Sequence, residues 1–383
     1  MTQKLSSTMI TSLASSKLTG ALPAISGASL TGFATGPTNS AVDPAINTNP
    51  SDGVGSAWVN RTSGSLFVCT DATTNANVWN NIANNFGAAT NAFGGNGLGK
   101  TNAYTSGGYK VGDKYNIIDR FSIPSAAICV DHGDLVIGSA SPSGCSSLTH
   151  GYCIAGSIND PAPYTGICKF GFAYGSSSSV AANLSTGVYG PAGATSESKG
   201  YSFGGVSSVG NEAGIESFLL SSETTLADQG DLTVARRLSG CGHSSPSHGY
   251  ASTIGDGNSN IIDRFSFYSN AGASDHGDIS TSRGFAATTS ADTHGYVAGG
   301  SPSGSVIDKF AFASNVTGTS VGSLTQGDRI NLAGHSAQGY GYVAGSQTPN
   351  TAHIERWSTS SDNDAVDCTD LTQARGHVVG QQV

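Results

Sequence analysis

Charged residues are scarce in this chain of 383 residues, in which Asp, Glu, Lys and Arg together make up 11%. Typical soluble domains carry roughly 25%. Disorder is one interpretation, but disordered chains combine few aromatic residues with a high net charge. Here the formal net charge is −9, and 13 Tyr, 14 Phe and 53 Gly are spread along the chain. Short strands joined by glycine-rich turns fit this composition, so we expect an all-β fold.

Basic and apolar runs are missing as well. No four consecutive residues are Lys or Arg, and the acidic balance argues against a nucleic-acid partner. No apolar stretch approaches the roughly 20 residues that span a bilayer. Ser and Thr interrupt the N-terminus, which lacks the apolar core of a signal peptide. We therefore expect a protein made in a cytoplasm, without membrane insertion.

Signs of metal and redox chemistry are equally few. The seven Cys form no C-x-x-C pair, which indicates buried or scattered thiols. No H-E-x-x-H motif is present. We expect no metal, no cofactor and no catalytic residues.

What the sequence does contain is a unit of roughly 46 residues that recurs six times. Each copy opens on a Gly-Tyr pair, at Gly108-Tyr109, Gly151-Tyr152, Gly200-Tyr201, Gly249-Tyr250, Gly295-Tyr296 and Gly341-Tyr342. A second signal, I-D-R-F or a variant, begins at Ile118, Ile167, Ile215, Ile262, Ile307 and Ile354. From each Ile to the next paired Tyr there are 34 or 35 residues, whereas from each Tyr to the following Ile there are 9 to 15.

The constant interval is typical of packed strands, and the variable interval is typical of a surface loop. Around Ile262 the side chains alternate with the two-residue period of a strand. Four short strands in about 46 residues are the size of a propeller blade. Residues 374–381 resemble the strand before a Gly-Tyr pair, so we expect the C-terminus to complete the first blade. Six blades are expected, and a seventh built partly from residues 83–107 stays open.

Residues 100–383 resemble the kelch repeat. The features that carry this resemblance are the motif G-Y-V-A-G-G at 295–300, the hydrophobic strand that follows it and the later Arg. Gly204-Gly205 and Gly299-Gly300 keep the double glycine, whereas Ala155-Gly156 and Gly345-Ser346 do not. The resemblance implies a kelch-like β-propeller and nothing about chemistry.

Most residues that invite a catalytic or metal-binding interpretation belong to the repeat itself. Seven of the nine His lie at repeat-equivalent positions, and His353 and His377 alone fall outside them. The residue after the repeated Ile is acidic in five units, at Asp119, Glu216, Asp263, Asp308 and Glu355. Basic residues lie 46 apart at Arg237, Arg283, Arg329 and Arg375. We expect these side chains to stabilise the fold, not to carry out catalysis.

The N-terminal part differs in texture. We expect residues 1–50 to be an extended low-complexity anchor segment, 51–83 a small β-hairpin unit, 84–107 a Gly/Asn-rich linker and 108–383 the propeller. K-L-T-G-A-L-P-A-I-S-G-A-S-L-T-G at 17–32 and the segment from Gly53 to Trp79 resemble bacteriophage tail-fibre and other virion structural proteins. That resemblance implies localisation in a virion, attachment to other virion proteins through residues 1–83, and a homo-oligomer such as a trimer.

The variable loops are the expected binding surface: 110–117, 157–166, 206–214, 254–260, 301–306 and 347–353. Their polar residues suit a host surface glycan or protein. The candidate binding residues are Asp113, Tyr115, Asn159, Asp160, Tyr164, Asn211, Glu212, Asp256, Asn258, Ser303, Asn350 and His353. Three functions stay open: host-surface binding by a virion protein, decoration of a capsid or tail without a receptor role, and, most weakly, degradation of a polysaccharide.

Overall fold

The computed structural model describes residues 37–45, 47–62, 66–81, 101–123, 129–159, 162–173, 178–226, 228–253 and 259–382. Over these residues the chain is all-β, as expected, and it contains no helix long and apolar enough to cross a membrane. The chain divides into two compact units, Met1–Ile82 and Ala83–Val383. Each is described by itself.

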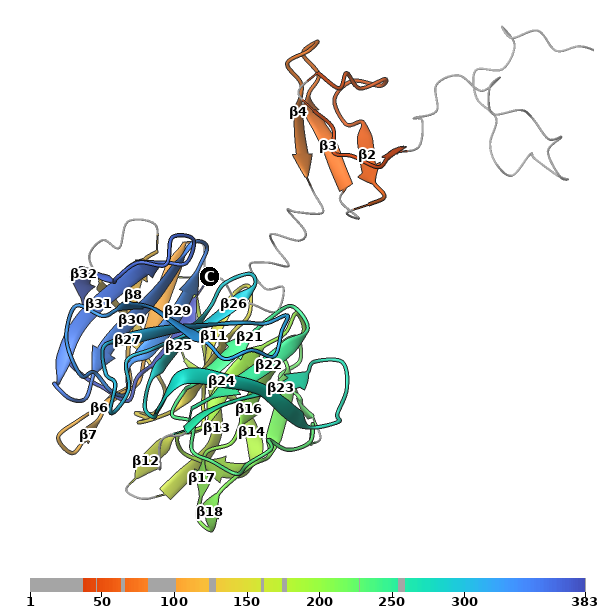
Figure 1. The fold of residues 1–383 in the computed structure, drawn as a ribbon. Helices are drawn as coiled ribbons and strands as arrows, with labels where there is room; N and C mark the ends of the chain where they lie inside the picture. The colour runs from red at the N-terminus through yellow and green to blue at the C-terminus, as the bar shows by residue number, and fades with distance from the viewer. Residues whose placement is uncertain are drawn as a thin grey trace, which may run out of the picture. The chain divides into compact units, whose positions relative to one another are not determined.

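The N-terminal unit is a four-stranded sheet (Figure 1). Its strands are β1 (Thr38–Ser40), β2 (Ala57–Asn60), β3 (Leu66–Asp71) and β4 (Val78–Asn81). The antiparallel β2–β3 pair confirms the predicted hairpin, and β1 adds to β2 in parallel. The Trp58 and Trp79 rings meet edge-on with 5.9 Å between centroids. Their indole N–H groups donate to Val42 O and Thr48 O, so the two tryptophans tie the loop before β2 to the sheet.

The described part of the second unit contains five four-stranded antiparallel sheets and one five-stranded sheet, one for each repeat, which we number 1 to 6. Sheet 1 contains β33 (Val379–Gln382), β5 (Asn102–Ser106), β8 (Ile117–Ser122) and β9 (Val130–Asp134). Sheet 2 contains β10 (Ser143–Ser146), β11 (His150–Ile154), β13 (Ala162–Gly171) and β14 (Ser179–Val188), with β12 (Ser157–Asn159) added to β13. Sheet 3 contains β15 (Ala192–Thr195), β16 (Lys199–Phe203), β19 (Ile215–Leu219) and β20 (Thr225–Leu226).

Sheets 4 to 6 repeat the same order. Sheet 4 contains β21 (Gly242–Ser244), β22 (His248–Ser252), β23 (Ser259–Ser266) and β24 (Ala273–Arg283). Sheet 5 contains β25 (Ala287–Ser290), β26 (His294–Ala298), β27 (Val306–Ala311) and β28 (Thr319–Ser323). Sheet 6 contains β29 (Ala333–Ala337), β30 (Tyr340–Ser346), β31 (Thr351–Ser358) and β32 (Val366–Asp370). Two short hairpins stand outside the sheets: β6 (Tyr109–Lys110) with β7 (Asp113–Lys114), and β17 (Val206–Ser207) with β18 (Gly210–Asn211).

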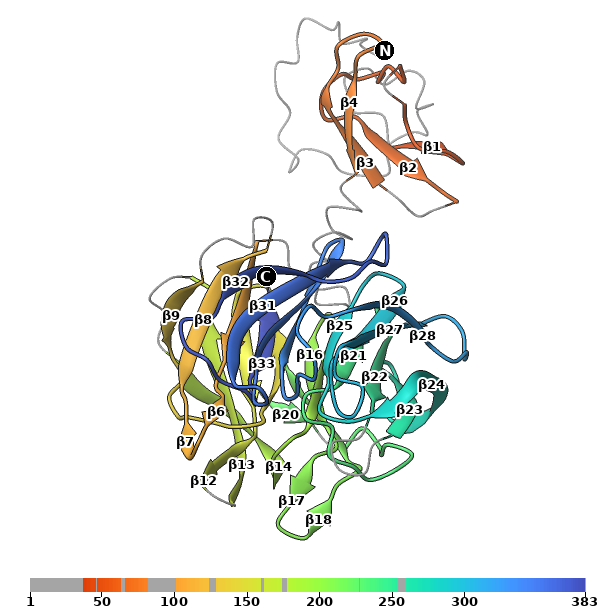
Figure 2. The same ribbon diagram turned by 60° about the vertical axis from the view of Figure 1, so that its left-hand side comes forward.

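Sheet 1 is assembled from the two ends of the second unit. The C-terminal strand β33 pairs with β5, with Val379 opposite Ser106, as predicted for the end of the chain. In Figure 2 the blue β33 therefore belongs to the same sheet as the orange β8. The first strands of the six sheets also contact one another in cyclic order, β10 with β15, β15 with β21, β21 with β25, β25 with β29, β29 with β33, and β33 with β10.

Glycine allows these first strands to approach so closely. A Cβ on Gly242 would lie 2.1 Å from Gly193 O, and one on Gly334 would lie 2.0 Å from Thr288 O. Five sheets have Gly at this position: Gly380, Gly144, Gly193, Gly242 and Gly334. Sheet 5 has Thr288, whose hydroxyl donates to Gly242 O at 2.7 Å. The spacing of the first strands thus depends on residues without a side chain.

The Gly-Tyr signal has a packing cause. A Cβ on Gly249 would meet the Phe265 ring at 2.3 Å, so glycine lets this ring lie against the backbone. The neighbouring Tyr250 is buried, and its hydroxyl donates to Phe312 O of sheet 5 at 3.2 Å. Each paired Tyr of this kind therefore joins its own sheet to the next.

The first tyrosine of the repeat lies earlier in the chain than the Gly-Tyr pairs predicted. In sheet 1 the buried tyrosine equivalent to Tyr250 is Tyr104, on β5, and not Tyr109, which lies in the β6–β7 hairpin. Strand β5 falls within residues 84–107, which were expected to be a linker. Ala103 stands where the other repeats have Gly, and this substitution concealed the pair.

Candidate functional site

Four buried ion pairs use most of the repeated charges. They join Arg375 to Asp119, Arg236 to Asp263, Arg283 to Asp308 and Arg329 to Glu355, with N–O distances of 2.6 to 3.0 Å. All eight side chains are fully buried. Each Arg precedes the first strand of a sheet, and its acid lies on the third strand of that sheet.

Each carboxylate of these pairs is also held by a hydroxyl residue or its backbone. The Thr372 N–H and hydroxyl both donate to Asp119, at 3.1 and 2.6 Å. Arg375 also donates to Thr105 O, so the pair connects three segments of sheet 1. The Arg series lies within the sheets of the fold, as expected, with one correction. In sheet 4 the buried residue is Arg236 and not Arg237, because one extra residue precedes β21.

The repeated histidines also serve the fold. His243 and His335 are buried on first strands, where His243 contacts Thr289 O and Ser252 Oγ, and His335 contacts Thr105 Oγ1. Burial lowers the pKa of each to about 4, which leaves both rings neutral at pH 7. No group of three metal-ligating side chains occurs within the described part of the chain.

All seven thiols are free, as predicted, and six are buried. Burial raises the pKa of Cys241 to about 11, which disfavours the reactive thiolate.

The expectation of no catalytic residues overlooked two short motifs in the sequence, one typical of nucleophilic enzymes and one that binds phosphate in other folds. G-T-S-V-G at 318–322 matches the nucleophile pattern, but it lies on the outer strand β28 and not at a strand-to-helix turn. G-G-N-G-L-G-K-T at 94–101 matches the phosphate-binding pattern. Residues 94–100 lie outside the described residues, and Thr101 leads into strand β5, where that motif requires a helix.

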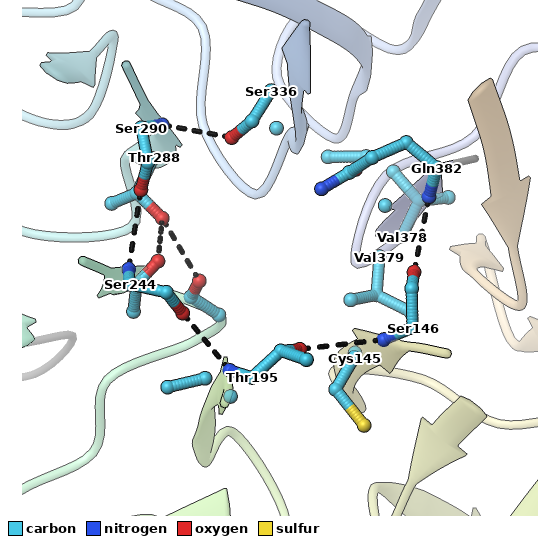
Figure 3. A pocket seen from close by; sticks show the side chains of 18 of the residues that line it. Cys145, Ser146, Thr195, Ser244, Thr288, Ser290, Ser336, Val378, Val379 and Gln382 are labelled. Atoms are coloured by element: carbon cyan, nitrogen blue, oxygen red, sulfur yellow. Dashed lines mark hydrogen bonds between the residues drawn. The ribbon is translucent and has the colours of Figure 1, made fainter. Parts of the chain in front are cut away.

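The first strands enclose a cavity of about 70 Å³, which Figure 3 shows. An open series of hydrogen bonds follows its wall, each from a backbone N–H of one first strand to the hydroxyl of a neighbouring first strand. The bonds are Ser146 N to Thr195 Oγ1, Thr195 N to Ser244 Oγ, Ser244 N to Ser290 Oγ, Ser290 N to Ser336 Oγ, and Gln382 N to Ser146 Oγ. These hydroxyls hold the sheets together, so we assign the cavity to the fold.

A larger pocket, of about 210 Å³, lies where two variable loops meet the segments before four first strands. We call it the loop pocket, and its lining is Tyr109, Lys114, Ala140, Ser141, Ser157, Tyr189, Arg237 and His377. Loops 110–117 and 157–166 are joined there, since Lys114 Nζ donates to Ser157 Oγ at 3.0 Å.

The side chains of the loop pocket combine aromatic rings with cations. The Arg237 guanidinium lies 5.0 Å from the Tyr189 ring centre and 5.3 Å from that of Phe285. His377 Nδ1 lies 2.6 Å from Ser141 Oγ, and its ring meets Tyr109 edge-on. Burial, and then the charge of Arg237, lower the pKa of His377 to about 4, so its ring is neutral at pH 7. The described lining includes no carboxylate.

Those of the expected binding residues that the structure describes are spread over several loops and do not form one cluster. Asp113, Asn211 and Asn350 are exposed, and Tyr115, Glu212 and Ser303 are partly exposed. Tyr164 packs against the core of sheet 2, and His353 lies 3.1 Å from an Asp370 oxygen on the edge of sheet 6. Asp160, Asp256 and Asn258 lie outside the described residues, as does the side chain of Asn159.

None of the expected binding residues whose side chains the structure describes lines the loop pocket. Two of its main residues were interpreted as parts of the repeat: Tyr109 as the tyrosine of a Gly-Tyr pair, and Arg237 as one of the arginines that recur every 46 residues. His377 was set apart because it breaks the repeat, and such departures are the signal that finds this site. The chain matches no protein-family model, and no curated protein matches it significantly. The geometry, with aromatic rings, two cations and hydroxyl groups in an open pocket, is suited to binding a polar ligand.

Proposed function

We propose that the second unit is a six-bladed kelch-like β-propeller. The cyclic contacts of the first strands and the pairing of β33 with β5 support a closed ring. A second set of hydrogen bonds supports it too, running between the residues that precede each first strand. Its members are Ser141 N to His377 O, Gly190 N to Ser141 O, Ser239 N to Gly190 O, Asn331 N to Phe285 O and His377 N to Asn331 O.

We propose further that the protein is a structural protein of a bacteriophage virion that binds a host surface glycan through the loop pocket. The pocket is the observation that carries this proposal, because it joins two variable loops on an otherwise uniform frame. The N-terminal unit is compact by itself, which suits a separate attachment module. The assignment to a virion rests on the resemblance of residues 17–32 and 53–79 to bacteriophage virion structural proteins.

Sugar binding fits the chemistry of the lining. Tyrosine rings offer rigid apolar faces with a polar edge, which suit the mixed surface of a sugar ring. Ser141, Ser157 and Lys114 offer hydrogen-bond groups at the rim. The proposal includes binding without catalysis.

The test uses the full chain as a soluble competitor of phage adsorption and as a probe on an array of bacterial surface polysaccharides. Replacing Tyr189 or Lys114 with Ala should reduce binding roughly tenfold or more, because each removes a side chain that lines the pocket. Tyr268→Ala is the matched control, since Tyr268 is 80% exposed and does not line the pocket. Full binding by both pocket variants, with intact circular dichroism spectra, would refute the proposal.

A further inference from the structure

Sheets 2 and 3 lack the buried arginine that the other four sheets share. A repeated hydrogen bond identifies the equivalent position in these two sheets. In it, the backbone N–H of the second residue of the double glycine donates to the backbone O of the arginine of the next sheet. Gly205 N donates to Arg236 O and Gly300 N to Arg329 O, and in the same way Gly156 N donates to Val188 O. Val188 therefore stands in sheet 3 where Arg236 stands in sheet 4.

Sheet 3 does contain a carboxylate at the position of the acidic partner. Glu216 follows the repeated Ile, as Asp263 does, and it accepts the Ser185 N–H at 2.7 Å. Asp263 accepts the Thr233 N–H at 3.0 Å in the equivalent contact. The carboxylate and its backbone donor are thus in place, and the arginine alone has been replaced.

A cavity of about 50 Å³ lies beside this carboxylate. Its lining is Leu184, Thr186, Val188, Ser202, Gly204, Glu212, Gly214 and Glu216. Ser202 follows the paired Tyr201, and the residue at that position supplies a carbonyl to the arginine elsewhere. Arg236 donates to Ala251 O at 3.3 Å and Arg283 to Val297 O at 2.9 Å. Glu216 and Glu212 are partly exposed, so the cavity can be reached from solvent.

We propose that this cavity binds a guanidinium group supplied from outside the chain. A guanidinium placed there would meet the Glu216 carboxylate and the Ser202 carbonyl, the two kinds of acceptor that hold Arg236 and Arg283 in their sheets. Planar guanidinium suits such paired acceptors better than a spherical ammonium ion. The inference does not depend on glycan binding, because this cavity shares no lining residue with the loop pocket. The group can belong to a free small molecule or to an arginine side chain.

Calorimetric titration of the full chain with methylguanidinium tests the proposal, and methylurea is the neutral control of the same shape. Saturable binding of methylguanidinium, and at least tenfold weaker binding of methylurea, is the expected result. Glu216→Gln should weaken methylguanidinium binding about tenfold or more, whereas Glu197→Gln, at an exposed position outside the cavity, should leave it unchanged. Equal binding of the two compounds, or equal affinity of Glu216→Gln and wild type, would overturn the proposal.

Val188→Arg provides a second test by supplying the group from within the chain. It should abolish the binding of methylguanidinium. The Glu216→Gln comparison decides the matter even if this larger side chain disturbs its surroundings. Titration with N-acetyl-arginine amide separates the two sources: binding tighter than methylguanidinium indicates an arginine side chain, and weaker binding indicates a small molecule.

Discussion

Sheets 1, 4, 5 and 6 of the second unit differ from sheets 2 and 3 in one buried interaction. The first group has an arginine and a carboxylate fully enclosed in each sheet. Sheet 3 has Val188 with Glu216, and sheet 2 has Ser139 with Cys168. The loop pocket includes Ser141 and Ser157 of the sheet 2 region, and the cavity beside Glu216 lies in sheet 3. The missing arginine of sheet 3 therefore coincides with one candidate binding site, and the sheet 2 region contributes part of the other.

The comparison also shows what a buried ion pair contributes. A wholly buried pair gains little over a well-packed apolar pair, because both charges lose their hydration. Removing one partner is far more costly, since the other charge stays buried and uncompensated. Sheet 3 avoids this problem because Glu216 is partly exposed, whereas Glu355 in sheet 6 is fully buried.

The largest expected effect comes from giving sheet 6 the chemistry of sheet 3. Arg329→Val should reduce the free energy of unfolding by about 3–5 kcal/mol, because it leaves the buried Glu355 carboxylate without its guanidinium. Urea unfolding followed by circular dichroism measures the loss. Lys309→Met is the control, since it breaks the partly exposed Lys309–Asp362 pair and should cost less than about 1 kcal/mol. Similar losses in the two variants would contradict the comparison.

These differences show how much of the structure the sequence could predict. The repeat predicted the strands, because packing fixes the number of residues between Ile262 and Tyr296. The same regularity predicted that the C-terminal strand completes sheet 1. It failed at Tyr104, where Ala103 replaces the usual Gly, and at Arg236, where one added residue shifts the register. The loop pocket was missed because it forms between segments far apart in the sequence, such as Ser141 and His377.

A second effect concerns the middle of the first strands, where sheets 4 and 6 have His243 and His335 and sheet 1 has Gln381. The His335 pKa is about 4 in the folded protein, against 6.5 for an unperturbed ring. Between these values the unfolded chain binds a proton that the folded protein does not, so stability falls as the pH drops from about 6.5 to about 4. The loss amounts to about 3 kcal/mol for one ring.

Replacing His335 with Gln should therefore remove about 3 kcal/mol of this acid-induced loss and change stability at pH 7 much less. Urea unfolding at pH 4 and pH 7 measures the difference. His294→Gln is the control, because that ring lies partly exposed on a second strand and is less buried than the His335 ring. An unchanged pH dependence in His335→Gln would show that the ring does not stay neutral in the folded protein.

The smallest of the three effects concerns the glycines that let the first strands approach. A Cβ on Gly334 would lie 2.0 Å from Thr288 O, and backbone on both sides leaves little room for adjustment. Gly334→Ala should cost about 1–3 kcal/mol through this overpacking, which thermal unfolding can measure. Gly327→Ala is the matched control, because a Cβ there would meet nothing within 4 Å. Thr288 shows that a side chain is tolerated only where its hydroxyl reaches the carbonyl of the neighbouring strand, here Gly242 O. Gly334→Thr should consequently be tolerated better than Gly334→Val, which has the same shape without the hydroxyl, and the reverse order would mean that the close approach is not what selects glycine here.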